Sequence, residues 1–220
     1  ISQTAPDDKS RWFQILDANN TPDQEAAGWI QPWSELLSPI DRRDNAPLKG
    51  ISVKHPDDIS AVLDVALDQN YQFLFLDATG GNADWASELM NQPRFELLSE
   101  TVIEMRRRKK EEALVLIYSG GVRSGTDAAR LIALGANAVV YGVAAALALG
   151  GEIGQSQIEW RSDRAPGERT DGLTSILNAH AGEASMMARC TGKTCLHNLE
   201  PEDLRSVTLA TSAATNIPVP

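Results

Sequence analysis

The chain has 220 residues, of which 42% are hydrophobic and 23% are charged, so it can bury the core of one folded domain. Thirty acidic residues against twenty basic ones give a formal net charge of −10, which opposes binding to a nucleic-acid backbone or an anionic membrane. The longest apolar run, residues 143–149, is far shorter than the ~20 residues of a membrane-spanning helix. These features predict a protein without nucleic-acid or membrane partners.

The start of the chain bears on its compartment. No basic segment followed by a hydrophobic one opens the sequence, which predicts a cytoplasmic protein. Because the first residue is Ile1 rather than Met, a processed precursor that has lost an organelle-targeting segment, or a fragment of a longer chain, stays open as an alternative.

Residues 1–48 show no clean period of two or 3.6 in their apolar positions. They contain Trp12, Trp29 and Trp33, four prolines before residue 40, and turns rich in Asp and Asn. We therefore expect an irregular N-terminal arm whose tryptophans pack against the body of the protein or a partner. A stacking platform for a flavin is the alternative role for these rings.

Residues 49–151 carry four consecutive strand–helix units. The first strand, residues 51–54, ends in Lys54, and Pro56 then opens a helix with an apolar face. The second strand, residues 73–76, runs into a loop containing Gly80 and Gly81, and a helix over residues 95–105 follows. The basic run at the end of that helix, residues 106–110, is typical of a solvated last turn.

The third and fourth units contain the strongest functional signal of the chain. An apolar strand over residues 114–118 leads into Ser119, Gly120 and Gly121, and a strand over residues 138–141 leads into Gly142. Glycines let main-chain N–H groups approach an anion, and the first N–H groups of the helix opened by Thr126 and Asp127 are expected to add to the same site. The pattern predicts a phosphate cradle with Arg123 nearby; a tight turn that needs glycine only for its conformation is the alternative.

Residues 152–220 form a loop and a helical C-terminal extension. The segment 152–172 is polar and contains Gly and Pro, which favours a loop. A helix with Leu173, Ile176 and His180 on one face follows, and Pro201 starts a second helix. We expect His180 to be a core residue with its hydrogen bonds satisfied.

Residues 115–151 resemble the FMN-binding synthase domain of the glutamate synthase family. That family has a Gly-Gly-hydrophobic-Arg-Ser/Thr-Gly-x-Asp run, then Ala-Leu-Gly-Ala, then Gly-x-Ala-Ala-Leu-x-x-Gly; here these are residues 120–127, 133–136 and 142–150. The resemblance implies FMN as cofactor and an α/β fold, namely the second half of a parallel (β/α) TIM barrel. It also implies that Lys54 lies against the flavin ring and that Gly80 and Gly81 border the substrate face.

Four strand–helix units are about half of a barrel that needs about 250 residues. A half-barrel would expose strand edges and an apolar face, so we expect an oligomer or a protein partner that completes the barrel. Three origins stay open: the chain is a fragment, another polypeptide supplies the other half, or two half-barrels pair.

The segment 184–195 resembles the region in which glutamate synthases bind an iron–sulfur cluster through three cysteines. Cys190 and Cys195 match the last two of these, whereas Ala184 stands in the position of the first. Because such clusters are held mainly by thiolates, the sequence predicts no stable cluster. Replacement of the missing ligand by His197 is the alternative.

By this resemblance the chain is an FMN-dependent oxidoreductase that forms glutamate or an N-methylglutamate-type product from small substrates such as glutamate or 2-oxoglutarate. The sequence shows no nucleophile set that would assign a catalytic side chain. One rival interpretation is a non-catalytic, degenerate half-barrel subunit that serves assembly or binds a phosphorylated metabolite. Another is a barrel similar to inosine-monophosphate dehydrogenase, but Cys190 lies too far past the last strand to match the catalytic cysteine of that family.

Overall fold

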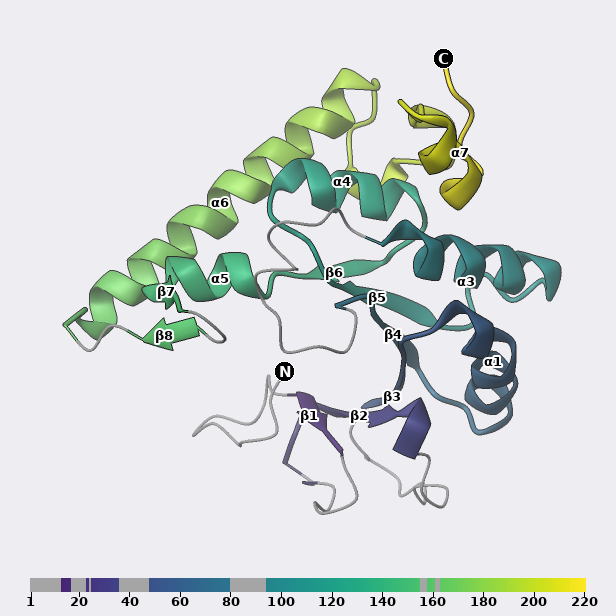
Figure 1. The fold of residues 1–220 in the computed structure, drawn as a ribbon, viewed down its shortest axis with the longest axis horizontal. Coiled ribbons are helices and arrows are strands. Elements are labelled where there is room, and N and C mark those ends of the chain that lie inside the picture. The colour runs from purple at the N-terminus through teal and green to yellow at the C-terminus, as the bar shows by residue number, and fades with distance from the viewer. Residues whose placement is uncertain are drawn as a thin grey trace.

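The computed structural model describes residues 13–16, 23, 25–35, 48–79, 94–154, 158–160 and 163–220. Within these residues six parallel strands form one curled sheet, in which each strand pairs with the next along the chain (Figure 1). The strands are β1 (Phe13–Ile15), β2 (Gly28–Pro32), β3 (Leu48–Val53), β4 (Phe73–Asp77), β5 (Val115–Ser119) and β6 (Ala138–Val140). Consecutive parallel neighbours are the arrangement of a (β/α) barrel, so the predicted fold class is confirmed.

Helices connect the later strands. They are α1 (Ile59–Asp68), preceded by the 3-10 turn η2 (Pro56–Asp58), α3 (Phe95–Arg107), α4 (Gly125–Ala133) and α5 (Val143–Ala148). Alternate strand residues such as Val53, Leu76 and Tyr118 point to the core shared with α1, α3 and α4. Their neighbours Phe73 and Phe75 form a separate cluster with Ile30 on the opposite face of the sheet. The sheet is thus apolar on both faces, as barrel strands are.

The N-terminal arm differs from the expectation of irregular structure. Its described residues include β1 and β2, which extend the sheet beyond β3, and the short 3-10 turn η1 (Trp33–Glu35). Trp29 is buried at 2% exposure in a small cluster with Leu16 and Ala26, and Trp33 packs against the main core. The expected packing against the body of the protein is confirmed for Trp33, whereas Trp29 packs within the arm and Trp12 lies outside the described residues.

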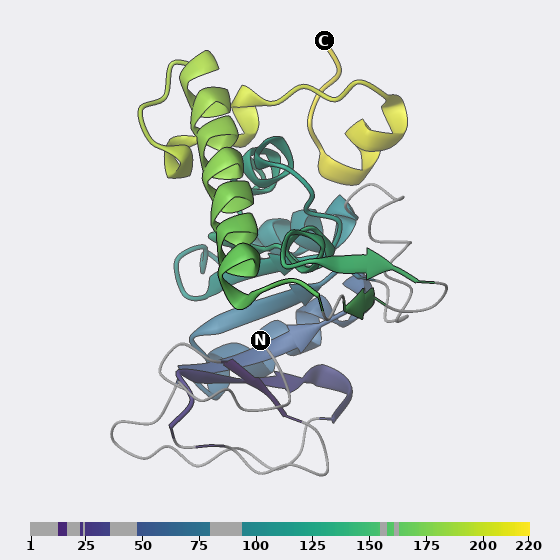
Figure 2. The same ribbon diagram turned by 90° about the vertical axis from the view of Figure 1, so that its left-hand side faces the viewer.

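The C-terminal extension begins with an antiparallel pair, β7 (Gly151–Ile153) and β8 (Ile158–Trp160), where the sequence predicted only a loop. The long helix α6 (Pro166–Cys190) then crosses α4 and α5, as Figure 2 shows from the side. Two 3-10 turns, η3 (Leu196–Asn198) and η4 (Pro201–Asp203), and the helix α7 (Leu209–Thr215) complete the chain. The helix expected from Pro201 is therefore a single turn. In the described part of the chain, no helix has both the length and the apolar character to cross a membrane.

The basic end of α3 has a structural role. Arg108 donates from its Nε to Glu104, 2.7 Å away, and also bonds Asp64 and Ser60 of α1. Hydrogen bonds from Arg107 and Arg108 lower the pKa of Glu104 to about 2. These contacts hold α3 against α1. The guanidinium groups of Arg107 and Arg108 are therefore paired with carboxylates of the protein itself.

Candidate functional site

The sheet register brings the predicted site residues to one edge. Asp77 pairs with Ser119, and Ser119 pairs with Val140, so the carboxyl ends of β4, β5 and β6 lie side by side. Val53 pairs with Leu76, which places Lys54 next to this row. Gly80 and Gly81 lie outside the described residues. Ligands of parallel α/β sheets bind at this edge, as expected for the candidate site.

The cradle has the backbone conformation that its glycines permit. Gly120 and Gly121 have φ angles of +130° and +69°. A Cβ on Gly120 would lie 2.8 Å from the carbonyl carbon of Ala78, because the loops after β4 and β5 touch there. Gly121 and Val122 are buried residues, and their main-chain N–H groups form no hydrogen bond with another described residue. Adjacent unpaired donors in such a turn suit the oxygens of a phosphate.

The N-terminus of α4 does not add donors to the cradle, contrary to expectation. The N–H of Gly125 donates to Oε2 of Glu183 at 2.8 Å, and the N–H of Asp127 donates to Oγ of Ser124 at 3.1 Å. Asp127 in turn accepts from the N–H of Arg123 at 3.2 Å and lies 3.6 Å from its Nε. These groups are satisfied inside the protein, so an anion at the cradle depends on the glycine loop itself.

Lys54 is held at the sheet edge by a carboxylate. Its Nζ lies 3.6 Å from Oδ2 of Asp77, and the Lys54 side chain is 46% exposed. The other oxygen of Asp77 accepts hydrogen bonds from the N–H of Thr79, at 3.1 Å, and from its hydroxyl. Asp77 therefore fixes both the ammonium group and the start of the loop that leads to Gly80. This role of Asp77 was not expected from the sequence. Its place directly after an apolar strand, like that of Lys54 after the neighbouring strand, is a usable signal.

An aromatic pair connects the strand end before Gly142 to α6. The rings of Tyr141 and His180 lie 4.9 Å apart, and the Tyr141 hydroxyl donates to the carbonyl of Ser124 at 3.4 Å. Burial raises the pKa of Tyr141. Nδ1 of His180 is buried without a hydrogen-bond partner among the described residues, so the expectation of a satisfied histidine is wrong. The ring packs on tyrosine instead.

The structure gives a physical reason for an alanine at position 184. Ala184 is 3% exposed and packs with Ala188 against Ala129 and Ala133 of α4. Cys190, the last residue of α6, and Cys195, directly before η3, are exposed free thiols. Across the described ranges, no group of three or more His, Cys, Asp and Glu side chains could hold a metal ion.

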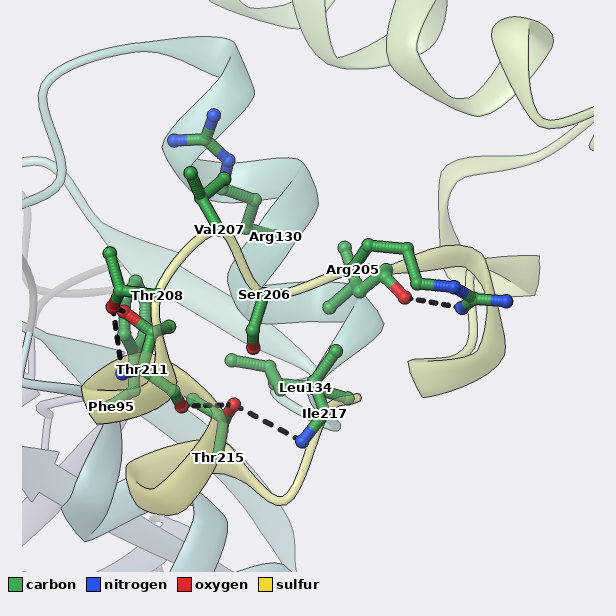
Figure 3. A pocket seen from close by; sticks show the side chains of 11 residues that line it. Phe95, Arg130, Leu134, Arg205, Ser206, Val207, Thr208, Thr211, Thr215 and Ile217 are labelled. Carbon is green, nitrogen blue, oxygen red and sulfur yellow. Dashed lines mark hydrogen bonds between the residues drawn. The ribbon is translucent and has the colours of Figure 1, made fainter. Parts of the chain in front are cut away.

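A cavity of about 390 Å³ lies away from the sheet edge, between α3, the end of α4 and the C-terminal segment (Figure 3). Its walls include Phe95, Leu134 and Ile217. Its two arginine head groups point away from the labelled side chains in the centre (Figure 3). The guanidinium of Arg205 donates to the carbonyls of Glu202 and Leu204, at 3.0 and 2.6 Å. The cavity is therefore largely apolar and has no cation directed into it.

Comparison with known proteins supports a flavin-binding domain. A family model described as FMN-dependent dehydrogenase matches residues 94–159, which include the cradle loop. A glutamate synthase large subunit-like protein of Rhizobium meliloti (strain 1021) is 29% identical over 170 residues, covering 64% of this chain and 38% of that protein. These matches confirm the resemblance to the FMN-binding domain of the glutamate synthase family and support FMN as the cofactor. The chain spans well under half of the length of this relative.

Solved structures show the same fold. The recombinant flavin-binding domain of baker's yeast flavocytochrome b2 superimposes with a TM-score of 0.54 at 23% identity, covering 79% of this chain and 38% of that chain. A variant of flavocytochrome b2 gives a TM-score of 0.57 at 20% identity, over 89% of this chain and 50% of the other. At these identities the likeness establishes the fold: the curled sheet corresponds to part of a TIM barrel.

Proposed function

We propose that this chain, similar to the FMN-binding domain of the glutamate synthase family, is the flavin-phosphate half of an oxidoreductase that forms glutamate or an N-methylglutamate-type product. One observation carries the proposal. Gly120 and Gly121 adopt left-handed backbone conformations at the carboxyl edge of the sheet, and the main-chain N–H groups of Gly121 and Val122 bond no residue in the described part of the chain. The resemblance of this loop to the family motif supports the choice of FMN over other phosphorylated ligands.

Each candidate residue then has a stated task. The N–H groups of Gly121 and Val122, with Gly142 and Arg123 nearby, bind the phosphate; Ser119 ends the strand that carries this loop. Lys54 lies against the flavin ring, where its charge favours electron density on the ring, and Asp77 holds the ammonium in place. Gly80 and Gly81 border the substrate face. FMN, when bound, supplies the electron-transfer chemistry.

The proposal includes a division of the chain and a partner. The division is into residues 49–151 as the cradle-bearing half-barrel, residues 1–48 as the arm whose strands β1 and β2 extend its sheet, and residues 152–220 as the extension whose helix α6 packs on α4 and α5. In the described sheet, β1 and β6 each have one neighbouring strand, so both outer edges can pair further. A second copy or another cytoplasmic polypeptide completes the barrel and contributes the rest of the pocket for glutamate or 2-oxoglutarate.

An absorbance spectrum and two titrations test the cofactor assignment. We expect flavin bands near roughly 370 and 450 nm in the purified protein, and binding of FMN well above that of riboflavin, which lacks the phosphate. Equal affinity for both would contradict the cradle. A protein that binds neither flavin would favour the rival function, a half-barrel subunit kept for assembly.

The sheet edges make association a separate test. Light scattering is expected to give a mass of at least two chains, or of a complex when a partner is co-purified. Glutamate-forming activity is expected only in that assembly, since the pocket of a barrel draws residues from strands around the ring. A stable monomer that binds FMN would retain the cofactor assignment and remove the claim of barrel completion.

A further inference from the structure

The N-terminus of α4 is closed by a side chain from the distant helix α6. The carboxylate of Glu183 accepts from the N–H of Gly125 at 2.8 Å and from the hydroxyl of Thr126. The partners are 58 and 57 residues apart in sequence. Helix N-termini favour negative charge, so an ionised carboxylate is the matched partner for these donors.

The backbones of α4 and α6 approach so closely at this point that only glycine is accommodated. A Cβ on Gly125 would lie 2.1 Å from the carbonyl oxygen of His180 and 2.7 Å from the nitrogen of Ala184. Beyond Gly125, buried alanines of the two helices pack together. The position of Glu183 relative to α4 is therefore set by backbone contact and not by a flexible surface side chain.

The turn between the cradle and α4 is bonded to the same helix end. Asp127 accepts from the N–H of Arg123, and Ser124 accepts from the N–H of Asp127. The hydroxyl of Tyr141, which packs on His180 of α6, donates to the carbonyl of Ser124. Displacement of the α4 N-terminus would thus move the residues that directly follow Gly121 and Val122.

We propose that Glu183 is a positioning residue, which holds the N-terminus of α4 and through it the conformation of the cradle loop. Because Glu183 accepts hydrogen bonds from Gly125 and Thr126, these donors of α4 are not available to bind the cofactor phosphate. Hydrogen bonds from the Thr126 hydroxyl and the Gly125 main chain lower the pKa of Glu183, consistent with an ionised carboxylate at this place. The functional part of this inference rests on the proposed FMN site; the structural part does not.

The test uses the full chain and two readouts. Glu183→Gln keeps the side-chain size and removes the charge and one acceptor, and Asp171→Asn is the control, an exposed carboxylate on the same helix. Hydrogen exchange by mass spectrometry, in the flavin-free protein, is expected to be faster over residues 120–127 in Glu183→Gln and unchanged in Asp171→Asn. The Kd for FMN is expected to rise about tenfold in Glu183→Gln, with the Kd for riboflavin unchanged.

A second pair of variants protects against a misfolded Glu183→Gln protein. Thr126→Val removes one of the bonds to the carboxylate, and Thr126→Ser retains it, so faster exchange is expected in the first and not in the second. Unchanged exchange over residues 120–127 in both Glu183→Gln and Thr126→Val would overturn the inference. Faster exchange with an unchanged Kd for FMN would overturn the link to the cradle. A parent protein that binds no FMN would contradict the proposed function, while the exchange result would still decide whether Glu183 holds the turn.

Discussion

The two ends of α4 lie beside two different candidate sites. The cradle loop directly precedes its N-terminus, and the cavity under the C-terminal segment lies beside its last turn. The cavity has a volume of about 390 Å³, and its threonine hydroxyls bond within the segment, as in the bonds of Thr215 to Thr211 and Ile217. Among the hydroxyls of its described lining, that of Ser206 has no hydrogen-bond partner. At the cradle, Gly121 and Val122 are buried residues, and their main-chain N–H groups form no hydrogen bond with any residue that the structure describes. Two adjacent main-chain donors suit the oxygens of an anion, whereas a single hydroxyl in a largely apolar cavity does not, so the cradle is the better place for an anionic cofactor.

Replacement of Gly121 is the strongest way to break the cradle. Gly121→Val would force a β-branched residue into a φ of +69°, a conformation that such residues avoid, and would place a Cβ beside the phosphate donors. We expect the Kd for FMN to rise about a hundredfold or more, measured by fluorescence titration. Gly182→Val is the matched control, because a Cβ at Gly182 meets nothing within 4 Å. Undiminished FMN binding by Gly121→Val would show that the cradle is placed wrongly.

Replacement of Gly125 disturbs the N-terminal end of α4 from outside the cradle. The new Cβ of Gly125→Ala would collide with the backbone of α6, so we expect the free energy of unfolding to fall by about 2–3 kcal/mol in urea titrations. Gly182→Ala is expected to leave stability unchanged or raise it by up to about 1 kcal/mol, since alanine favours helix over glycine. Equal stability of the two variants would mean that α4 and α6 are less tightly packed than the structure indicates.

Replacement of Lys54 tests the binding of the flavin ring separately from the binding of the phosphate. Lys54→Met removes a charge expected beside the ring, so the Kd values for FMN and riboflavin should both rise, by about tenfold. The cradle variant, by contrast, should affect FMN far more than riboflavin. Lys110→Met, at an exposed position after α3, controls for the change in net charge. A rise in the Kd for FMN alone, with an unchanged Kd for riboflavin, would indicate that Lys54 binds the phosphate and not the ring.

The regular units of this fold were predictable because their signals are local. Strands β4 and β5 are mostly continuous apolar runs, and α1 and α4 have amphipathic spacing, so the signal for each element lies within a few residues. The loop glycines after β5 were found for the same reason, since their spacing carries the family motif. The conformation of Gly120 and Gly121, with φ above zero, agrees with what such a motif requires.

The missed features depend on partners distant in sequence. Strands β1 and β2 have three and five residues, and nothing in their composition marks them. They are strands because β2 pairs with β3 and β1 pairs with β2. Glu183 reads as an ordinary surface glutamate of a helix, and its bond to Gly125 becomes visible only once α6 lies on α4. A carboxylate three residues from a histidine on the same helix carries no local signal of such a role.

Replacement of Ser206, in the cavity at the other end of α4, is expected to have the smallest effect on stability. Its side-chain oxygen is buried with no hydrogen-bond partner in the described structure, and Figure 3 shows the hydroxyl in the centre of the cavity. Ser206→Ala should therefore raise the free energy of unfolding by up to about 1 kcal/mol and leave the Kd for FMN unchanged, because no partner loses a bond.

Thr215 is the contrasting position for Ser206. Its hydroxyl donates to the carbonyl of Thr211 at 2.7 Å and accepts from the N–H of Ile217 at 3.3 Å, so Thr215→Val should lower the free energy of unfolding by about 1–2 kcal/mol. If Ser206→Ala instead lost as much stability as Thr215→Val, the Ser206 hydroxyl must have a partner in solution. The cavity would then hold a polar occupant. The contrast between a ligand-binding cradle at one end of α4 and a largely apolar cavity at the other would be lost.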